Sequence, residues 1–261
     1  MHIKPKKGLG QNFLIDKNIQ RKIIAACQFK SSNTVLEIGA GRGELTRLLA
    51  DTVGRLFALE IDPFLSKILQ DDFKGYPNIK IINGDILKFN LRRYFAKLKN
   101  KIKIIGNIPY YITTPIIEHL LKSRDKIDTI FLTVQKEFAK RITATSTSGD
   151  YSSFSCFLQY YTNPQILFSI NKTCFRPMPK VDSSFLRLEI RQKAAVITKN
   201  EKLFFQIIRS AFNKRRKTLR NSLRDRVSPE KLDKFFIKYG INRNIRPENL
   251  TLQDFANLTN I

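Results

Sequence analysis

Residues 36–46 read LEIGAGRGELT, and in this segment Gly39, Gly41 and Gly43 occupy every second position. An apolar run precedes these glycines, and a helical pattern begins after them. Glycine lets the backbone turn sharply and approach a ligand closely, because it has no Cβ atom. We therefore expect a buried strand that is joined to a helix by a ligand-binding loop.

Predicted strands and helices alternate along the chain around this loop. The apolar runs expected as strands cover residues 34–39, 55–60, 79–82, 102–107 and 129–135. This alternation is typical of an α/β protein with a doubly wound, mostly parallel sheet, which is a Rossmann-like fold. Such sheets bind ligands outside the carboxyl ends of their strands. Gly39, Glu60, Asp85 and Asn107 all fall at those ends, so they form the predicted site.

The residues after the first three strands indicate the kind of cofactor. Glu60 lies about twenty residues beyond the glycine loop, as expected for an acid that binds ribose hydroxyls. The glycine spacing differs from the Gly-x-Gly-x-x-Gly that supports a pyrophosphate, so S-adenosylmethionine is favoured over a nicotinamide cofactor. Asp85 is placed to accept a hydrogen bond from an adenine amino group. The alternatives are a tight turn with a surface Glu60 and a turn-forming Asp85. Asp62 is interpreted as a helix N-cap.

Residues 106–111 read GNIPYY and end the fourth predicted strand. Pro109 fixes φ, so the turn is stiff and can hold the Asn107 side-chain oxygen beside a backbone carbonyl. Two acceptors suit an amine with two hydrogens, because they favour a pyramidal nitrogen whose lone pair points at a methyl group. Tyr110 offers a ring on which an extruded base stacks. The alternative is a strand-end turn with core tyrosines.

The composition favours a polyanionic partner and argues against several other classes of protein. The formal net charge is +25 and the pI is about 10.1, which favours nucleic acid over the alternative of scattered, solvated lysines. No apolar run reaches the roughly 18–20 residues of a membrane span, and no secretory signal is expected. The three cysteines, Cys27, Cys156 and Cys174, are far apart and predict reduced thiols in a cytoplasmic protein. The two histidines, His2 and His119, are too few to predict a metal site.

The character of the chain changes near residue 190. Residues 165–170 and 183–190 are expected as further strands, and the later sequence is helical and basic. We therefore predict a catalytic domain over residues 1–190 and a smaller all-α domain over residues 191–261. The second domain opens with a cluster of cations. Those predicted to contact RNA phosphates are Arg215, Arg216, Lys217 and Arg220. The alternative is a solvated charged face.

Five motifs together resemble the ribosomal RNA adenine N6-dimethyltransferases. They are GQNFL at 10–14, LEIGAGRGELT at 36–46, NIPYY at 107–111, FRPMPKVDSSFLRL at 175–188 and AFNKRRKTLRNSL at 211–223. They occur in order along nearly the whole chain. The resemblance implies that S-adenosylmethionine is contacted by Gln11, Asn12, Leu14, Gly39, Gly41, Glu60, Asp85 and Asn107. It also implies a catalytic set of Asn107, Pro109, Tyr110 and Phe175, in which the two rings hold the base.

The motifs PKVDS and FNKRRKTLRNSL resemble the branch of this family that acts on the small ribosomal subunit. The resemblance implies dimethylation of two adjacent adenines near the 3′ end of that subunit's RNA, within a pre-30S particle, by a monomer. One alternative is a large-subunit rRNA adenine methylase. The other is an RNA-binding ribosome-assembly factor without turnover.

Overall fold

The computed structural model describes residues 6–214 and 216–261, which form two units. The first comprises the chain up to Ala139 and Gln165–Ile190, and the second comprises Lys140–Pro164 and Arg191–Ile261. The predicted domains had a single boundary after residue 190, so the two divisions differ in the segment 140–164. This segment belongs to the second unit because its buried side chains Tyr151, Cys156 and Tyr160 lie in that unit's apolar cluster.

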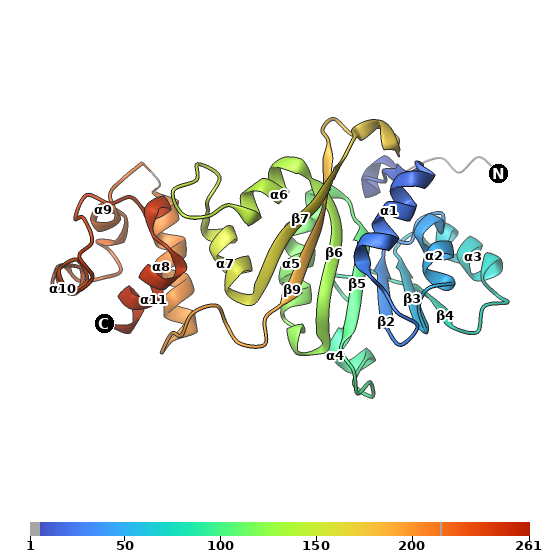
Figure 1. Cartoon of the computed structure of the whole chain (residues 1–261), viewed down its shortest axis with the longest axis horizontal. Coiled ribbons are helices and arrows are strands. Elements are labelled where there is room, and N and C mark those ends of the chain that lie inside the picture. The colour runs from blue at the N-terminus through green and yellow to red at the C-terminus, as the bar shows by residue number, and fades with distance from the viewer. Residues whose placement is uncertain (1–5, 215) are drawn as a thin grey trace. The chain divides into compact units, whose positions relative to one another are not determined.

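Within the described residues, the first unit contains a seven-stranded sheet of order β4-β3-β2-β5-β6-β9-β7 (Figure 1). The strands are β2 Thr34–Ile38, β3 Arg55–Glu60, β4 Ile79–Asn83, β5 Ile102–Asn107, β6 Ile127–Gln135, β7 Thr162–Ile170 and β9 Ser183–Ile190. Neighbours among β2 to β6 pair in parallel, and β9 pairs with β6 antiparallel. The predicted Rossmann-like α/β class is therefore confirmed.

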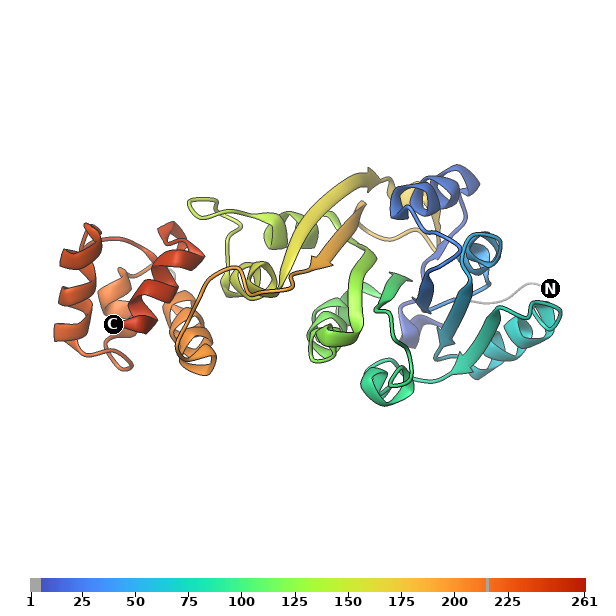
Figure 2. The ribbon, with the colours of Figure 1, turned by 60° about the horizontal axis from the view of Figure 1, so that its bottom comes forward.

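Helices cover both faces of this sheet. Figure 2 shows α1 and α2 on one face and α4 and α5 on the other. The α-helices of this region are α1 Lys17–Cys27, α2 Glu44–Ala50, α3 Pro63–Asp72, α4 Leu91–Tyr94, α5 Thr113–Leu121 and α6 Lys136–Thr143. Strands that are buried on both faces read as continuous apolar runs, which is why they were recognisable in the sequence.

A short antiparallel ladder of β1 (Phe13–Leu14) and β8 (Phe175–Arg176) fixes the N-terminal segment to the first unit. The Ile15 amide extends the ladder, donating to the Cys174 carbonyl at 2.9 Å. The side chains of Phe13 and Leu14 are 6% and 3% exposed. Burial of one such side chain stabilises the fold by roughly 1.5–3 kcal/mol, so the chain is firmly attached at the last two residues of the GQNFL motif.

The second unit is helical around its own apolar cluster. Its α-helices are α7 Ser153–Tyr161, α8 Glu201–Asn213, α9 Leu219–Leu223, α10 Pro229–Tyr239 and α11 Leu252–Asn260. The Ser228 hydroxyl caps α10, Pro229 is its first residue, and Gly240 ends it with φ 63°. Among the described residues, none of the helices combines the length and apolarity needed to cross a membrane.

Short 3-10 helices connect several of these elements. They are η1 Lys7–Leu9, η2 Tyr110–Ile112, η3 Arg124–Lys126, η4 Lys172–Cys174 and η5 Pro247–Asn249. η2 directly follows β5, so it carries the last residues of the GNIPYY segment.

Candidate active site

The glycine loop lies at the carboxyl end of β2 and has the backbone that its sequence predicted. Gly39, Gly41 and Gly43 have φ values of 73°, 61° and 81°. This is a left-handed backbone conformation that residues other than glycine rarely adopt. A Cβ atom on Gly43 would lie 2.9 Å from a methyl group of Leu69. The loop therefore requires glycine both for its backbone angles and for its close packing against α3.

Glu60, at the end of β3, is held by backbone amides on both sides. Its Oε2 accepts from the Gly41 amide at 2.8 Å and its Oε1 accepts from the Asp62 amide at 2.9 Å. Burial raises the pKa of this carboxyl, and the two amide hydrogen bonds oppose that shift. Each carboxylate oxygen retains a lone pair, so Glu60 can accept from ribose hydroxyls without leaving its position.

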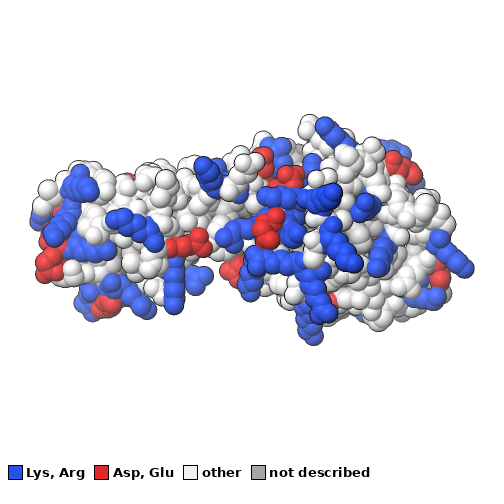
Figure 3. Space-filling view, turned by 90° about the horizontal axis from the view of Figure 1, so that it is seen from below, with Lys and Arg blue, Asp and Glu red and all other residues white. Residues whose placement is uncertain are grey.

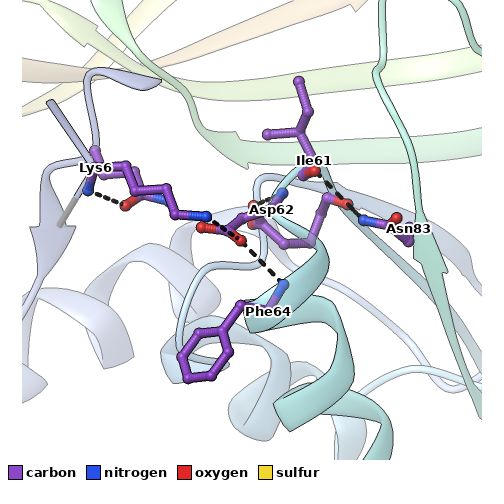
Figure 4. A network of polar contacts seen from close by, with 7 residues as sticks. Lys6, Ile61, Asp62, Phe64 and Asn83 are labelled. Carbon is purple, nitrogen blue, oxygen red and sulfur yellow. Dashed lines mark hydrogen bonds and ion pairs between the residues drawn. The ribbon is translucent and has the colours of Figure 1, made fainter. Parts of the chain in front are cut away.

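Asn83, at the end of β4, supports the backbone beneath Glu60. Its Nδ2 donates to the Glu60 carbonyl at 2.9 Å and to the Ile61 carbonyl at 3.4 Å (Figure 4). The Ile61 side chain is consequently turned outward and is 47% exposed. An isoleucine between two acids was the available sequence signal for this cavity-lining residue, and the sequence analysis did not use it.

Asp62 caps α3, as predicted, and also holds the N-terminal segment. Its Oδ1 accepts from the Phe64 amide at 3.0 Å and from Lys6 Nζ at 2.9 Å (Figure 4). The pKa of Asp62 is lowered: burial raises it, but the hydrogen bonds from Lys6 and Phe64 outweigh that effect. Lys6 was not expected to reach this acid.

Residues 6–14, called here the N-terminal strap, run over the glycine loop and the GNIPYY turn. The Lys6 amide donates to Gln11 Oε1 at 2.9 Å. A Cβ atom on Gly10 would lie 2.9 Å from the Tyr111 ring. The Phe13 ring packs on Gly41 and lies 4.3 Å from the Arg42 guanidinium carbon. The strap thus contacts both halves of the predicted site.

Asn107 is the catalytic candidate whose orientation is best defined. Its Nδ2 donates to the Asn12 carbonyl at 2.9 Å, and its Oδ1 accepts no hydrogen bond from any described residue. The Pro109 carbonyl accepts from the Ile112 amide at 3.3 Å, whereas the Ile108 carbonyl accepts none within residues 6–214 and 216–261. The side-chain oxygen of Asn107 and the carbonyl of Ile108 are therefore the acceptors that remain available.

The Tyr110 ring is held in place from the other side of the turn. Its hydroxyl lies 2.6 Å from Ser183 Oγ at the start of β9. Burial raises the pKa of the Tyr110 hydroxyl, and the contact with Ser183 opposes that rise. A raised pKa favours the neutral phenol, which suits a fixed ring better than a base.

Two adjoining cavities of about 80 and 70 Å³ lie beneath the strap. The predicted residues that line the first are Gln11, Asn12, Gly39, Gly41, Glu60, Asn107, Pro109 and Tyr110. Asp85 lines the second, together with Ile61, Ile86 and Ile108. Strap residues form part of the wall of both cavities: Leu9 lines the two, and Gly10 and Phe13 line the first.

Asp85 forms the turn that was one of its two interpretations, and its contact with an adenine amino group stays a prediction. Its Oδ1 accepts from the Leu87 amide at 2.9 Å, which forms the expected turn. Its Oδ2 accepts from no described residue, and Asp85 lines the cavity beside Ile86. A turn-forming carboxylate can thus still offer one oxygen to an amino group on a ring that packs against Ile61 and Ile86.

Leu14 and Phe175 lie apart from these cavities. They face each other in the β1–β8 ladder and are 3% and 2% exposed within an apolar cluster. Within the described chain, neither of them lines either cavity. Contact of Leu14 with the cofactor and of Phe175 with the base stay predictions that this arrangement does not support.

Glu37 is a buried acid beneath the site that sequence reasoning did not consider. It lies in the middle of β2, is 2% exposed, and accepts from Thr46 Oγ1 of α2 at 2.7 Å. Burial raises its pKa to about 8. A single acid inside an apolar strand was the signal that could have identified it. Among the described residues, no group of three or more His, Cys, Asp or Glu side chains could hold a metal ion.

The predicted RNA-contacting cations differ in their surroundings. Arg216 and Lys217 are exposed and form no ion pair with a described residue. Arg220 instead pairs with Asp233, and its guanidinium carbon lies 5.6 Å from the Phe236 ring. Arg220 therefore has a structural role in its own unit. Arg215 lies outside the described residues.

The fold and the site together define an S-adenosylmethionine-dependent methyltransferase. A glycine loop after β2, an acid after β3 and an Asn-x-Pro-Tyr turn after β5 meet at one edge of a Rossmann-like sheet. Residues 2–261 match the family model described as "Ribosomal RNA adenine dimethylase", and the chain belongs to this family.

Similar proteins agree with this assignment over nearly their whole lengths. "Ribosomal RNA small subunit methyltransferase A" of Lachnoclostridium phytofermentans is 42% identical, over 98% of this chain and 91% of the relative. The protein of the same name from Clostridium botulinum strain Loch Maree is 39% identical, over 97% of this chain and 92% of the relative.

Two solved structures share the fold at 26% identity. A dimethyladenosine transferase from Plasmodium falciparum has a TM-score of 0.81 and covers 94% of this chain and 95% of that one. The 23S rRNA methyltransferase ErmE has a TM-score of 0.76 and covers 95% and 98%.

Proposed function

We propose that the protein transfers methyl groups from S-adenosylmethionine to N6 of two adjacent adenines near the 3′ end of small-subunit rRNA. The product is N6,N6-dimethyladenosine, and the substrate is a pre-30S particle. The observation that carries this proposal is the free Oδ1 of Asn107, whose amide is oriented by the Asn12 carbonyl. The relatives named as small-subunit methyltransferases support the choice of rRNA.

The residues of the two cavities suit the parts of S-adenosylmethionine. Glu60 offers acceptors for the ribose hydroxyls, and Asp85 offers one for the adenine amino group. Ile61 and Ile86 supply apolar surface for the adenine ring, and the glycine loop permits close backbone approach. When bound, S-adenosylmethionine supplies an electrophilic methyl group on a sulfonium.

The Asn107 turn activates an amine that is a poor nucleophile. The lone pair of an exocyclic base amine is conjugated with the ring, so the amine must become pyramidal before it reacts. Asn107 Oδ1 and the Ile108 carbonyl accept its two hydrogens and favour that geometry. Tyr110 supplies the face on which the extruded base stacks, which is worth about 1–3 kcal/mol. Positioning and electrostatic stabilisation therefore accelerate the reaction. No strong base is needed in the transition state, because the methylated nitrogen becomes cationic and releases its proton to solvent afterwards.

Transfer of tritiated methyl groups to undermethylated small subunits, followed by nucleoside analysis, tests the proposal. The wild-type protein should yield N6,N6-dimethyladenosine. Asn107→Ala should lose at least a hundredfold in rate, as when an oxyanion-hole donor is removed, and should still bind the particle. The control is Asn244→Ala, because Asn244 is exposed. Undiminished methylation by Asn107→Ala would refute the mechanism.

The same assay distinguishes the two alternatives. An assembly factor without turnover would bind the particle and transfer no methyl groups. A large-subunit methylase would label undermethylated large subunits in preference to small ones. A monomeric state and a cytoplasmic location stay predictions, which sedimentation and fractionation can test.

A further inference from the structure

A polar pocket lies at the amino edge of the sheet, opposite the edge that carries the candidate active site. Its volume is about 490 Å³. Three loops form it, those that precede β2, β3 and β5. Its lining comprises residues 31–34, residues 54–55 and residues 97–100. The function proposed above makes no use of this pocket.

Close backbone contacts keep the walls of this pocket in place. A Cβ atom on Gly54 would lie 2.0 Å from the Ser31 carbonyl oxygen, so only glycine allows the first two loops to meet. The Arg55 amide donates to the Asn33 carbonyl at 3.3 Å. Asn33 Oδ1 accepts from the Lys30 amide at 2.9 Å, which closes a tight turn and leaves Ser31 at its tip. The pocket is thus a formed feature of the fold.

The lining of the pocket consists of cations and neutral polar groups. Arg55, Lys97 and Lys99 are exposed, and none of them forms an ion pair with a described residue. Two other cations at this edge are paired with acids: Arg92 with Asp125 at 2.8 Å and Lys103 with Asp128 at 3.8 Å. The pocket lining itself contains no acid.

The hydroxyls of Ser31 and Ser32 and the Asn100 amide add hydrogen-bond donors beside these cations. Figure 3, which views the molecule from the side of this edge, shows Lys and Arg side chains crowded around a few acids. Arginine, lysine and hydroxyl groups together are the donors that typically contact backbone phosphates of nucleic acids.

We propose that this pocket binds a backbone phosphate of the rRNA substrate and so forms a second docking contact, remote from the target adenine. This inference rests on the proposed function, because RNA is taken as the polyanion that a protein of net charge +25 engages. The pocket adds affinity and register without contacting the reacting base.

Binding of the full-length protein to undermethylated small subunits, measured over a series of salt concentrations, tests this proposal. The variant Arg55→Ser/Lys97→Ser/Lys99→Ser removes three unpaired cations. Lys17→Ser/Arg21→Ser/Lys74→Ser removes three exposed cations from α1 and the end of α3 and is the matched control. The pocket variant should bind several-fold more weakly than the control. Its slope of log K against log salt should be smaller by about one to three.

Catalysis provides a second readout that separates docking from chemistry. The pocket variant should keep the wild-type kcat at saturating subunits and the wild-type affinity for S-adenosylmethionine. Lysine acetylation needs no variant: Lys97 and Lys99 should become protected when the particle binds, while Lys74 should stay reactive. Equal binding by the pocket and control variants, or unprotected Lys97 and Lys99, would overturn the docking proposal.

Two further outcomes have distinct meanings. In the first, inorganic phosphate raises the melting temperature of the wild type but not that of the pocket variant, while the pocket variant and the control variant bind the particle equally. That result would make the pocket a small-anion site and overturn the RNA assignment. If the wild type transfers no methyl groups but its binding depends on the pocket, the enzymatic proposal fails and the docking contact stands.

Discussion

The side-chain amide of Asn107 donates to the backbone carbonyl of Asn12 at 2.9 Å, across 95 residues of sequence. This hydrogen bond joins the N-terminal strap to the catalytic turn. It fixes the nitrogen of the amide toward the strap and leaves the oxygen without a partner among the described residues. The position of the strap and the orientation of the Asn107 amide are therefore coupled through one hydrogen bond.

Asn107→Asp should separate the acceptor role of this side chain from its donor role. The carboxylate keeps an oxygen for the amine but cannot donate to the Asn12 carbonyl, and the two oxygens repel each other. Loss of one such hydrogen bond costs about 0.5–1.5 kcal/mol. We expect faster amide hydrogen exchange at residues 11–14 and up to tenfold weaker binding of S-adenosylmethionine. Unchanged exchange in the strap would contradict this coupling.

The Lys6–Asp62 ion pair is expected to hold the strap closed without stabilising the fold much. Lys6 is 54% exposed, and Asp62 keeps the hydrogen bond from the Phe64 amide when Lys6 is removed. Loss of the pair should therefore cost about 1 kcal/mol. Lys6→Ala and Asp62→Asn should weaken cofactor binding similarly, because asparagine caps a helix as well as aspartate does. Isothermal titration calorimetry provides the measurement.

Asp62→Ala should also lose the cap of α3, with a further decrease of about 0.5–2 kcal/mol in the free energy of unfolding. Lys74→Ala, on an exposed residue, is the control for Lys6→Ala. If Lys6→Ala leaves cofactor affinity unchanged while Asp62→Asn lowers it, Asp62 acts on the ligand directly and the ion pair does not hold the strap.

Glu37 should make stability fall as pH rises. Burial raises its pKa from 4.5 to about 8 in the folded state, so between those values the folded protein binds more protons than the unfolded chain. By linkage, this contribution to the free energy of unfolding is fully present below about pH 4.5. It is lost as the pH rises toward about 8.

Urea unfolding at about pH 5 and about pH 8 measures this effect. Glu37→Gln keeps an acceptor for Thr46 Oγ1 and removes the titrating group. The free energy of unfolding should therefore fall less between the two pH values in this variant than in the wild type, by an amount on the order of a few kcal/mol. The exposed Glu189→Gln is the control. The pKa of Glu60 is also raised, so Glu60 still lowers the free energy of unfolding with rising pH in the Glu37→Gln variant. Identical pH profiles for the wild type and Glu37→Gln would show that Glu37 is ionised in the folded state.

Local sequence pattern was sufficient for the sheet and for the residues that follow its strands. Strands buried on both faces must be continuously apolar, and a loop with three left-handed residues must carry glycines. Gly39, Glu60, Asp85 and Asn107 were therefore placed correctly at one edge, because parallel strands present their carboxyl ends together.

Contacts between distant segments were not predictable from such patterns. Lys6 reaches Asp62 only because the strap folds back over α3, and Arg220 is engaged by Asp233 on another helix. The resemblance placed Leu14 and Phe175 at the site. The β1–β8 ladder instead pairs their backbones and buries their side chains. Segment 140–164 lies in the second unit because its aromatic residues pack there, which periodicity alone does not reveal.

Tyr110 should act through its ring and not through its hydroxyl. Tyr110→Phe keeps the stacking face and loses only the contact with Ser183 Oγ, which lies 2.6 Å from the hydroxyl. We therefore expect a decrease in kcat/KM of no more than about tenfold, since one hydrogen bond contributes about 0.5–1.5 kcal/mol. Ser183→Ala removes the same contact and should give the same decrease. Tyr110→Ala removes the ring and should lose a further roughly five- to hundredfold, corresponding to about 1–3 kcal/mol of stacking.

Steady-state methylation of undermethylated small subunits measures these differences, with Tyr76→Ala as the control because that ring lies outside both cavities and is 41% exposed. Far-ultraviolet circular dichroism should be the same for the wild type and all four variants. A Tyr110→Phe variant as inactive as Tyr110→Ala would contradict the stacking role. In that case the hydroxyl would be the group that matters, either through its contact with Ser183 or as a donor to the base. An equal loss of activity in Ser183→Ala would show that the hydroxyl positions the ring. Retained activity in Ser183→Ala would show that the hydroxyl acts on the base itself.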